Sequence, residues 1–185
     1  HVPFALGEIK ENINITTNKL SKEQIINQAC KFHSQGKISE ASKYYQYFIN
    51  QNFKDYIVFS NYSLILENLG KLEEAELSIR EAIKLKPDLA EAHVNLGIIL
   101  RGLSKLEEAE LSLRKAIKLK PDLAEAHSNL GNVSRDLGKL IDAEISHRKA
   151  IALKPDLAEA YSNLGNVLID LGKLKEFINL SKSIL

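Results

Sequence analysis

The sequence predicts an all-α fold, a solenoid of about five helix-turn-helix units stacked one on the next. The phrase Pro-Asp-Leu-Ala-Glu-Ala begins at Pro87, Pro121 and Pro155, and so recurs every 34 residues. Within each period, apolar residues recur at three- and four-residue spacing, which gives each helix one buried stripe. Glycine stands between the two helical segments of most units, where the turn needs a residue at positive φ. Such a period is typical of a stack of small units rather than a conventional enzyme core.

Residues 1–21 precede the repeats, and we expect them to form an irregular lead-in, with a short strand at 13–16 as a minor alternative. The solenoid is expected over residues 22–185, with its last unit truncated. Ser21 and Gln24 fit a capping box that starts the first helix. The units begin at Lys22, Tyr56, Ala90, Ala124 and Ala158.

Turns, caps and charge pairs follow the same period. The turn glycines are Gly36, Gly70, Gly138 and Gly172, while Ser104 takes that place once and should cost about 1 kcal/mol there. An Asp answered by Glu three residues later is expected to cap the later first helices, at Asp88–Glu91, Asp122–Glu125 and Asp156–Glu159. Ion pairs worth a few tenths of a kcal/mol are expected on the solvent side of the second helices, at Glu76–Arg80, Glu110–Arg114 and Glu144–Arg148.

The composition excludes several functional classes. The 25 basic and 24 acidic residues nearly cancel, which removes the argument for nucleic acid or an anionic membrane surface as partner. No apolar run approaches the roughly 20 residues that span a bilayer, and no leader peptide is visible, so a cytoplasmic location is expected. A chain that opens at His1 and contains no methionine is expected to be a piece of a longer protein.

No catalytic residue, metal site or cofactor is predicted. The single cysteine, Cys30, excludes a disulfide framework and a cysteine-based zinc site. Cys30 and His33 can share one helical face, but the equivalent positions of the other units hold no matching pair.

The three histidines of the middle units are expected to be packing residues. His93 and His127 stand at the same position of two units, on helices about 10 Å apart. That distance is too great for both to ligate one zinc ion at about 2 Å. His147 replaces Leu113 and Ile79 of the preceding units, so we expect it to be partly buried.

Small and large residues occupy fixed positions in each unit, and this pattern resembles the tetratricopeptide repeat (TPR). Small residues stand at positions 8, 20 and 27, large apolar residues at 4, 7, 11 and 24, and proline at 32. The resemblance covers residues 22–185. It implies a right-handed superhelix whose first helices line a concave groove. It also implies binding of protein partners. The residues at position 8 are Ala29, Ser63, Gly97, Gly131 and Gly165.

Position 6 is asparagine in every unit, although asparagine is a mediocre helix former with no packing reason to recur within a helix. The resemblance places this position on the groove. A row of amides, each donor and acceptor, suits the backbone of an extended peptide. The row is similar to the asparagine ladder in the repeat arm of the O-linked N-acetylglucosamine transferases. Alternatively, each asparagine bonds a neighbouring helix or descends from a duplicated ancestor. The residues are Asn27, Asn61, Asn95, Asn129 and Asn163.

Four further candidates for peptide binding flank this row, at Asn132, Asn166, Arg101 and Arg135. Chaperone-binding members of the resembled family hold a peptide carboxylate with lysine at position 5. Because no lysine stands there, chaperone tails are not expected as ligands. Position 5 holds Ile26, Ser60, Val94, Ser128 and Ser162.

The predicted function is therefore a non-enzymatic module that binds an extended peptide or protein partner in its concave groove. The alternative is the substrate-recognition arm of a larger glycosyl- or sulfotransferase, a fusion that the resemblance implies for bacterial proteins. A third hypothesis is a structural role, with assembly through the ends of the solenoid. The apolar C-terminal end either fills space left by a missing repeat or docks on another subunit. Its residues are Phe177, Ile178, Ile184 and Leu185.

Overall fold

The computed structural model describes residues 20–184, with side chains described as far as Asn179. Within this range the chain forms ten α-helices and no strand. The predicted strand at 13–16 and nearly all of the lead-in lie outside the described residues. The helices are α1 (Lys22–Ser34), α2 (Ile38–Asn50), α3 (Tyr56–Asn68), α4 (Leu72–Leu85), α5 (Ala90–Gly102), α6 (Leu106–Leu119), α7 (Ala124–Asp136), α8 (Leu140–Leu153), α9 (Ala158–Asp170) and α10 (Leu174–Ile184).

The odd-numbered helices begin at Lys22, Tyr56, Ala90, Ala124 and Ala158, the residues at which the sequence is expected to open its five units. The chain divides into two compact units, residues 1–53 and 54–185. The first unit holds the pair α1–α2 and the second holds the four pairs from α3 to α10. One continuous solenoid across Phe53 and Lys54 stays a prediction.

In the first unit, helix α1 starts as the sequence predicts. The Ser21 hydroxyl accepts from the Gln24 amide and the Gln24 side chain accepts from the Ser21 amide, a complete capping box. The core between the two helices contains Tyr45 and Phe48, both fully buried. The Phe53 ring packs 5.3 Å from that of Phe48. Two aromatic rings therefore stand where the later repeats place alanine and proline.

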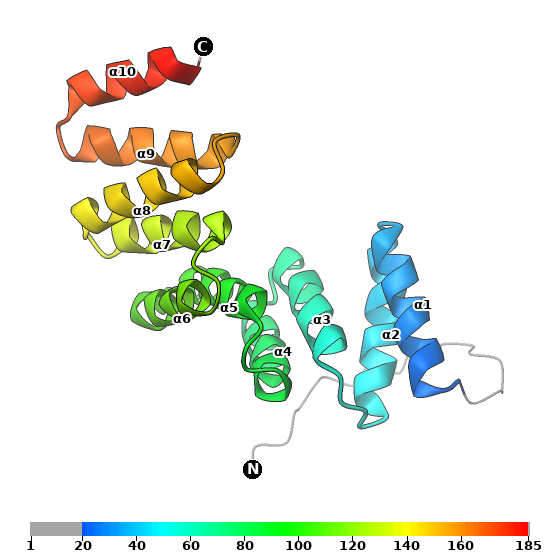
Figure 1. Cartoon of the computed structure of the whole chain (residues 1–185). Coiled ribbons are helices and arrows are strands. Elements are labelled where there is room, and N and C mark those ends of the chain that lie inside the picture. Colours follow the sequence, from blue (N-terminus) through cyan, green and yellow to red (C-terminus); the bar gives the residue numbers. More distant parts are fainter. Residues whose placement is uncertain (1–19, 185) are drawn as a thin grey trace. The chain divides into compact units, whose positions relative to one another are not determined.

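In the second unit each helix packs on the next along the chain, as Figure 1 shows for α3 to α10. The odd-numbered helices also contact one another, α3 with α5, α5 with α7 and α7 with α9. The even-numbered helices of this described unit make no comparable contacts among themselves. The stack is therefore closer on the side of the odd-numbered helices, which form its inner face, and the even-numbered helices form its outer face.

The turns inside the helix pairs have the predicted backbone. Gly70 has φ of 73° and the three other predicted turn glycines are also at positive φ. Ser104 holds the same conformation at φ 58°, so the predicted strain at this position is present.

Glycine at position 8 lets the two helices of a pair approach closely. A Cβ at Gly97 would lie 2.6 Å from Leu113 Cγ, and a Cβ at Gly131 would lie 2.6 Å from His147 Cε1. The equivalent Gly165 is less crowded, because the nearest atom to its Cβ position is Phe177 Cε2 at 3.3 Å. The small residues are therefore required by packing in α5 and α7 and much less in α9.

The prediction of aspartate caps is wrong. The residues that precede α5, α7 and α9 are Leu89, Leu123 and Leu157, and none of them makes a side-chain capping hydrogen bond. Asp88 lies one residue further upstream, in the turn after Pro87, and is out of register for the first helical amides. The acid that serves the helix start is Glu91. The pKa of Glu91 lies below its ordinary value, mainly because its carboxylate accepts a hydrogen bond from its own backbone amide. The hydrogen bond and charge of Lys120 lower it further.

The predicted i,i+4 ion pairs are confirmed, but their position on the solvent side is wrong. The side chains of Glu76, Glu110 and Glu144 are only 12%, 12% and 10% exposed. Each also accepts from a lysine of the next repeat. Lys139 lies 2.6 Å from Glu110 and, together with Arg114, lowers the pKa of that carboxyl. The pairs therefore join neighbouring repeats, which explains why glutamate recurs at this inward position.

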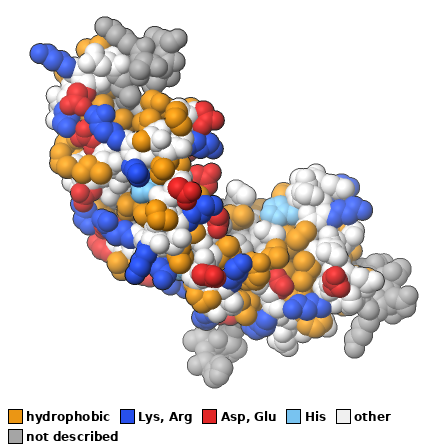
Figure 2. Space-filling view, viewed as in Figure 1, with side chains coloured by type: hydrophobic (Ala, Val, Ile, Leu, Met, Phe, Trp, Pro, Cys, Tyr) orange, Lys and Arg blue, Asp and Glu red, His pale blue; other side chains and the backbone are white. Residues whose placement is uncertain are grey.

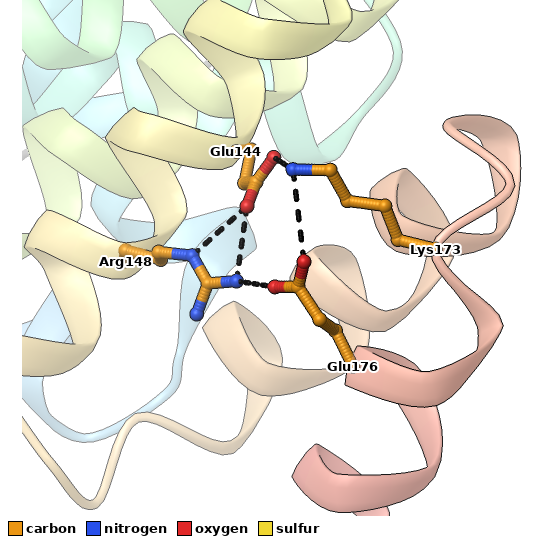
Figure 3. Close-up of polar contacts among 4 residues, drawn as sticks. All are labelled: Glu144, Arg148, Lys173 and Glu176. Carbon is orange, nitrogen blue, oxygen red and sulfur yellow. Dashed lines mark hydrogen bonds and ion pairs between the residues drawn. The ribbon is translucent and has the colours of Figure 1, made fainter.

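The last of these clusters contains four residues (Figure 3). Glu144 of α8 accepts from Arg148 and from Lys173, the residue before α10. Arg148 also donates to Glu176 of α10 at 2.5 Å. Two hydrogen-bonded ion pairs, Lys173–Glu144 and Arg148–Glu176, therefore join the two repeats. The equivalent Arg80 donates to Glu108 at 2.7 Å.

The three arginines Arg80, Arg114 and Arg148 are each followed, 28 residues later in the next repeat, by an acidic residue. For Arg114 this residue is an aspartate, Asp142, whereas for the other two it is a glutamate. The described residues include no ion pair between Arg114 and Asp142, whereas Arg80 and Arg148 each reach a glutamate. The aspartate is shorter by one methylene. We expect Asp142→Glu to complete the cluster and stabilise the fold by a few tenths of a kcal/mol, as an exposed pair does. A urea titration in low salt should show a higher midpoint, and high salt should remove the gain. Asp142→Gln is the matched control, and an equal gain in that variant would contradict the ion pair.

Candidate protein-binding face

The inner face of the second unit is a contiguous surface built from α3, α5, α7 and α9. Two ion pairs join neighbouring helices across it. Arg101 of α5 donates to Asp136 of α7 at 2.5 Å, and Arg135 of α7 donates to Asp170 of α9 at 2.6 Å. The bond to Asp170 raises the pKa of Arg135. Each bridge links the inner helices of two neighbouring repeats.

The two arginines that were predicted to bind peptide are thus already paired within the chain. Asp136 and Asp170 were not among the predicted site residues. The signal in the sequence was an arginine at position 12 of one repeat with an aspartate at position 13 of the next. A ligand would meet these arginines as parts of ion pairs and not as free cations.

The asparagine row of the second unit consists of Asn61, Asn95, Asn129 and Asn163, which lie on α3, α5, α7 and α9. All four are half-buried rather than enclosed in the core. Within the described residues, the side chains of Asn95 and Asn163 make no hydrogen bond, and the Asn129 side chain donates to the Glu125 carbonyl of its own helix at 2.9 Å. None of these three amides is used to join one repeat to another. Asn27, the fifth predicted member, is exposed on α1 in the other unit.

A second pair of amides extends the row. Asn132 is half-buried on α7 and Asn166 is exposed on α9, and neither side chain makes a hydrogen bond among the described residues. Each stands three residues after a member of the row, on the same side of its helix. On α5 the equivalent residue is Ile98. The inner face is therefore richest in amides over α7 and α9.

Position 5, beside this row, offers no charge to a ligand. Val94 and Ser128 are buried, and the Ser128 hydroxyl is one of four buried polar atoms without a hydrogen-bond partner in the described part of the chain. A peptide carboxylate would find no lysine at this position. The exposed chemistry of the face is amide, with arginine–aspartate pairs at its edge.

His93 and His127 have a second role that the sequence did not reveal. The Nε2 atom of each lies 3.0 Å from the carbonyl of the proline in the preceding loop, Pro87 or Pro121. Because a carbonyl only accepts, Nε2 carries the proton in each of these rings. Both histidines therefore pack, as predicted, and also fasten the loop between repeats.

His147 is fully buried and not partly buried as predicted. Neither of its ring nitrogens has a hydrogen-bond partner among the described residues, and the hydroxyl of Ser134 is also buried without a partner. Burial lowers the pKa of His147 to about 4, and the charge of Arg135 acts in the same direction. This histidine is a neutral core residue in the place of a leucine.

Cys30 and His33 are not assembled into a nucleophile and base. The Tyr45 hydroxyl lies 3.7 Å from Cys30 Sγ and 3.4 Å from His33 Nδ1, so it bridges the two. Over the described stretch, no group of three or more His, Cys, Asp or Glu residues is arranged to hold a metal ion.

The C-terminal end presents part of the predicted apolar surface. Phe177 is half-buried against the position of Gly165, whereas Ile178 is 51% exposed on α10. Ile184 and Leu185, the other two predicted residues, lie beyond the described side chains.

Among the described helices, none has the length and apolar character that a membrane span requires.

Comparison with known proteins identifies the repeat. A family model for the TPR repeat matches residues 99–138, and a second, for the tetratricopeptide repeat, matches residues 58–89 and 124–157. A search of curated protein sequences gave no match.

Several solved structures share the fold. MamA from residue 41 of Desulfovibrio magneticus RS-1 has a TM-score of 0.80 at 20% identity, covering 88% of this chain and 92% of that one. TTC0263, a thermophilic TPR protein of Thermus thermophilus, has a TM-score of 0.69 at 21% identity over 88% of this chain and 89% of that one. The first TPR of Spaghetti (RPAP3), bound to the HSP90 peptide SRMEEVD, has a TM-score of 0.61 at 22% identity over 63% of this chain and 93% of that one. At these identities the likeness shows the fold. Residues 58–89 and 99–157 therefore match tetratricopeptide repeats, and the described residues form ten helices in a fold similar to that of TPR solenoid proteins.

Proposed function

We propose that this chain is a non-enzymatic module that binds an extended segment of a partner protein along the inner face of its second unit. The fold suggests protein–protein interaction, and one TPR structure of similar fold holds a peptide. The observation that carries the proposal is the set of unbonded amides on this face, above all Asn95 and Asn163. A half-buried amide with no internal partner is ready to exchange hydrogen bonds with a peptide backbone.

The spacing of the row suits a strand-like ligand. Packed helices lie about 10 Å apart, and an extended peptide advances about 3.3 Å per residue. Each asparagine of the row would then meet the peptide about every third residue. Amides bind the backbone, so the row favours extended shape over one particular sequence. The second pair of amides, Asn132 and Asn166, would add contacts at the end of the face formed by α7 and α9.

The ligand that this chemistry favours differs from the HSP90 peptide of the RPAP3 structure. That peptide, SRMEEVD, is acidic and ends in aspartate. Here Arg101 and Arg135 are paired with aspartates, and position 5 supplies no lysine. A neutral, extended internal segment therefore fits this face better than an acidic chain terminus.

The test is selection of binding peptides from a displayed library of random peptides about 12 residues long, enough to span four rungs at about three residues each. A selected peptide is then titrated. We expect the variant Asn95→Ala/Asn129→Ala/Asn163→Ala to bind at least about tenfold more weakly. Three hydrogen bonds each contribute about 0.5–1.5 kcal/mol net, and about 1.4 kcal/mol corresponds to a factor of ten. Alanine is the better helix former, so helicity should be retained.

The matched control is Glu107→Ala/Lys118→Ala, which changes exposed polar side chains on the outer face of α6. This control should bind the selected peptide as the wild type does. Equal affinity in the asparagine variant, with its helicity intact, would refute the proposed role of the row.

A further inference from the structure

The inner face of the second unit differs in chemistry between its two ends. Position 9, three residues after each asparagine of the row, is aliphatic on α3 and α5 and amide on α7 and α9. Leu64 and Ile98 are the aliphatic pair, and both are half-buried. They stand one turn after Asn61 and Asn95, on the side of each helix that carries the row. A peptide held by the whole row would therefore meet aliphatic side chains at one end and amides at the other.

An acid stands at the aliphatic end where the later inner helices carry arginine. Glu67 occupies position 12 of α3, and the same position of α5 and α7 holds Arg101 and Arg135. Each arginine donates to an aspartate at position 13 of the following inner helix, so position 12 is turned toward the next repeat. For Glu67 the residue at position 13 of the next inner helix is Gly102, which has no side chain. The ion pair of the later repeats therefore has no counterpart between α3 and α5.

The carboxylate of Glu67 is half-buried and makes no hydrogen bond or ion pair within the described residues. Burial raises the pKa of Glu67, and no neighbouring cation offsets that rise. A cation brought by a ligand would favour the charged carboxylate that burial disfavours. Glu125 and Glu159 are also unpaired in the described part of the chain, but both are exposed, so water already solvates their charges. Glu67 therefore gains more from a positively charged partner than either of them.

Exposure alone does not mark this place, because hydrophobic side chains reach the surface of the second unit among charged ones (Figure 2). Scattered apolar residues of that kind are ordinary on a protein surface. Leu64 and Ile98 differ from them by their position on the inner face, where the amide row lies one turn before them and the unpaired Glu67 one turn after Leu64. Three kinds of contact, amide, aliphatic and anionic, are thus available to one ligand at this end.

We propose that the end of the inner face formed by α3 and α5 selects peptides that carry a lysine or arginine close to an aliphatic residue. The aliphatic side chain packs on Leu64 and Ile98, and the cation pairs with Glu67. The two peptide residues lie within about three of each other, the span of an extended chain between neighbouring helices. This inference rests on the proposed function, because the amide row holds the backbone that presents both side chains. It adds one cation to a segment that is otherwise neutral.

Peptide selection with the full chain and two variants tests the proposal, with the displayed library of random peptides about 12 residues long as the probe. The wild type should enrich peptides in which lysine or arginine lies within about three residues of leucine, isoleucine or valine. Glu67→Arg should enrich aspartate or glutamate in place of the base. Leu64→Asn/Ile98→Asn should keep the base and lose the preference for an aliphatic residue.

Both variants place residues that the fold already holds at these positions. Arginine stands at position 12 of α5 and α7, and asparagine stands at position 9 of α7 and α9. Circular dichroism checks that the helices are retained. Glu73→Arg is the matched control, because it changes the net charge by the same amount at an exposed position of α4. This control should select the same peptides as the wild type, which separates a local ion pair from general attraction between charges.

A double-mutant cycle measures the ion pair directly. One peptide selected by the wild type, and its variant with glutamate in place of the base, are each titrated against the wild type and Glu67→Arg. We expect either single reversal to weaken binding about fivefold, as loss of a partly exposed ion pair does. The two reversals together should restore most of the affinity, because opposite charges again face each other.

The outcomes separate this inference from the proposed function. The inference alone is overturned if the selected peptides need the asparagine row but contain no preferred base, or if Glu67→Arg selects the same peptides as the wild type. In both cases the asparagine row keeps its role. The proposed function fails, and this inference with it, if the selected peptides bind Asn95→Ala/Asn129→Ala/Asn163→Ala as tightly as the wild type. A library that yields no binding peptide counts against both.

Discussion

His147→Leu should stabilise the protein by about 1–3 kcal/mol at pH 7, which is the cost of the buried, unpaired nitrogens that the substitution removes. His147 is fully buried and both ring nitrogens lack partners in the described part of the chain. The preceding repeat shows that leucine fits, because Leu113 occupies the same position against Gly97 as His147 does against Gly131. The midpoint of urea unfolding, followed by circular dichroism, measures the gain.

The same substitution should remove a defined part of the pH dependence. The folded-state pKa of His147 is about 4, below its ordinary value of 6.5, so the unfolded chain takes up the proton first. Protonation of His147 therefore leaves the free energy of unfolding unchanged above pH 6.5 and lowers it as the pH falls from 6.5 towards 4. Between pH 7 and pH 5 the loss is about 2 kcal/mol. The carboxyls of Glu110 and Glu144 have lowered pKa values, so the stability that they contribute is lost at more acidic pH. That loss is common to the wild type and His147→Leu.

His147→Leu should therefore show a smaller loss of unfolding free energy from pH 7 to pH 5 than the wild type, by about 2 kcal/mol. His127→Leu is the control, because His127 is half-exposed and hydrogen-bonded to Pro121. Identical pH dependence in the wild type and His147→Leu would show that the ring is not held neutral in the fold.

Gly97→Ala and Gly165→Ala should change stability in opposite directions, although the two glycines stand at the same position of their repeats. A Cβ at Gly97 meets Leu113 Cγ at 2.6 Å and Cδ2 at 2.9 Å. Cγ is the branch point of a fully buried side chain, so the helices themselves must move apart. Overpacking of this kind costs about 1–3 kcal/mol, and only about 1 kcal/mol returns from the better helix propensity of alanine. We expect a net loss of up to about 2 kcal/mol.

At Gly165 the new methyl would lie 3.3 Å from Phe177 Cε2, the edge of a half-buried ring on the last helix. That ring needs to shift only slightly, so the helix propensity dominates and Gly165→Ala should gain up to about 1 kcal/mol. Denaturant titration of both variants under one set of conditions checks the pair. Equal effects at the two positions would contradict the packing described for α5 and α6.

Much of the fold could be predicted because local and periodic signals agree. The starts of α1, α3, α5, α7 and α9, the capping box of Ser21 and the positive φ of Ser104 all follow from sequence spacing. The aspartate caps were missed because a shift of one residue separates Asp88 from the capping position, and spacing alone does not resolve such a shift.

The contacts between repeats were harder to predict. Lys139 reaches Glu110 across 29 residues, and a helical wheel drawn for one helix cannot show that contact. The pairing of Arg101 with Asp136 was missed for the same reason, because the two residues lie in different repeats. The depth of His147 depends on how closely α8 approaches Gly131, which is a tertiary property. The alternative role as the recognition arm of a transferase stays a prediction, as does the cytoplasmic location.

The central claim is that the inner amides bind a peptide backbone. The most direct measurement is the side-chain amide signals of Asn95 and Asn163 in nitrogen-15 NMR spectra during titration with a library-selected peptide. Both amides lack internal hydrogen bonds within the described structure, so their signals report a new partner. We predict that these signals and the backbone amides of α5, α7 and α9 shift with peptide, while those of α4, α6 and α8 change little. The claim would be contradicted if saturating peptide shifted the backbone amide signals of α4, α6 and α8 and left the side-chain signals of Asn95 and Asn163 unchanged.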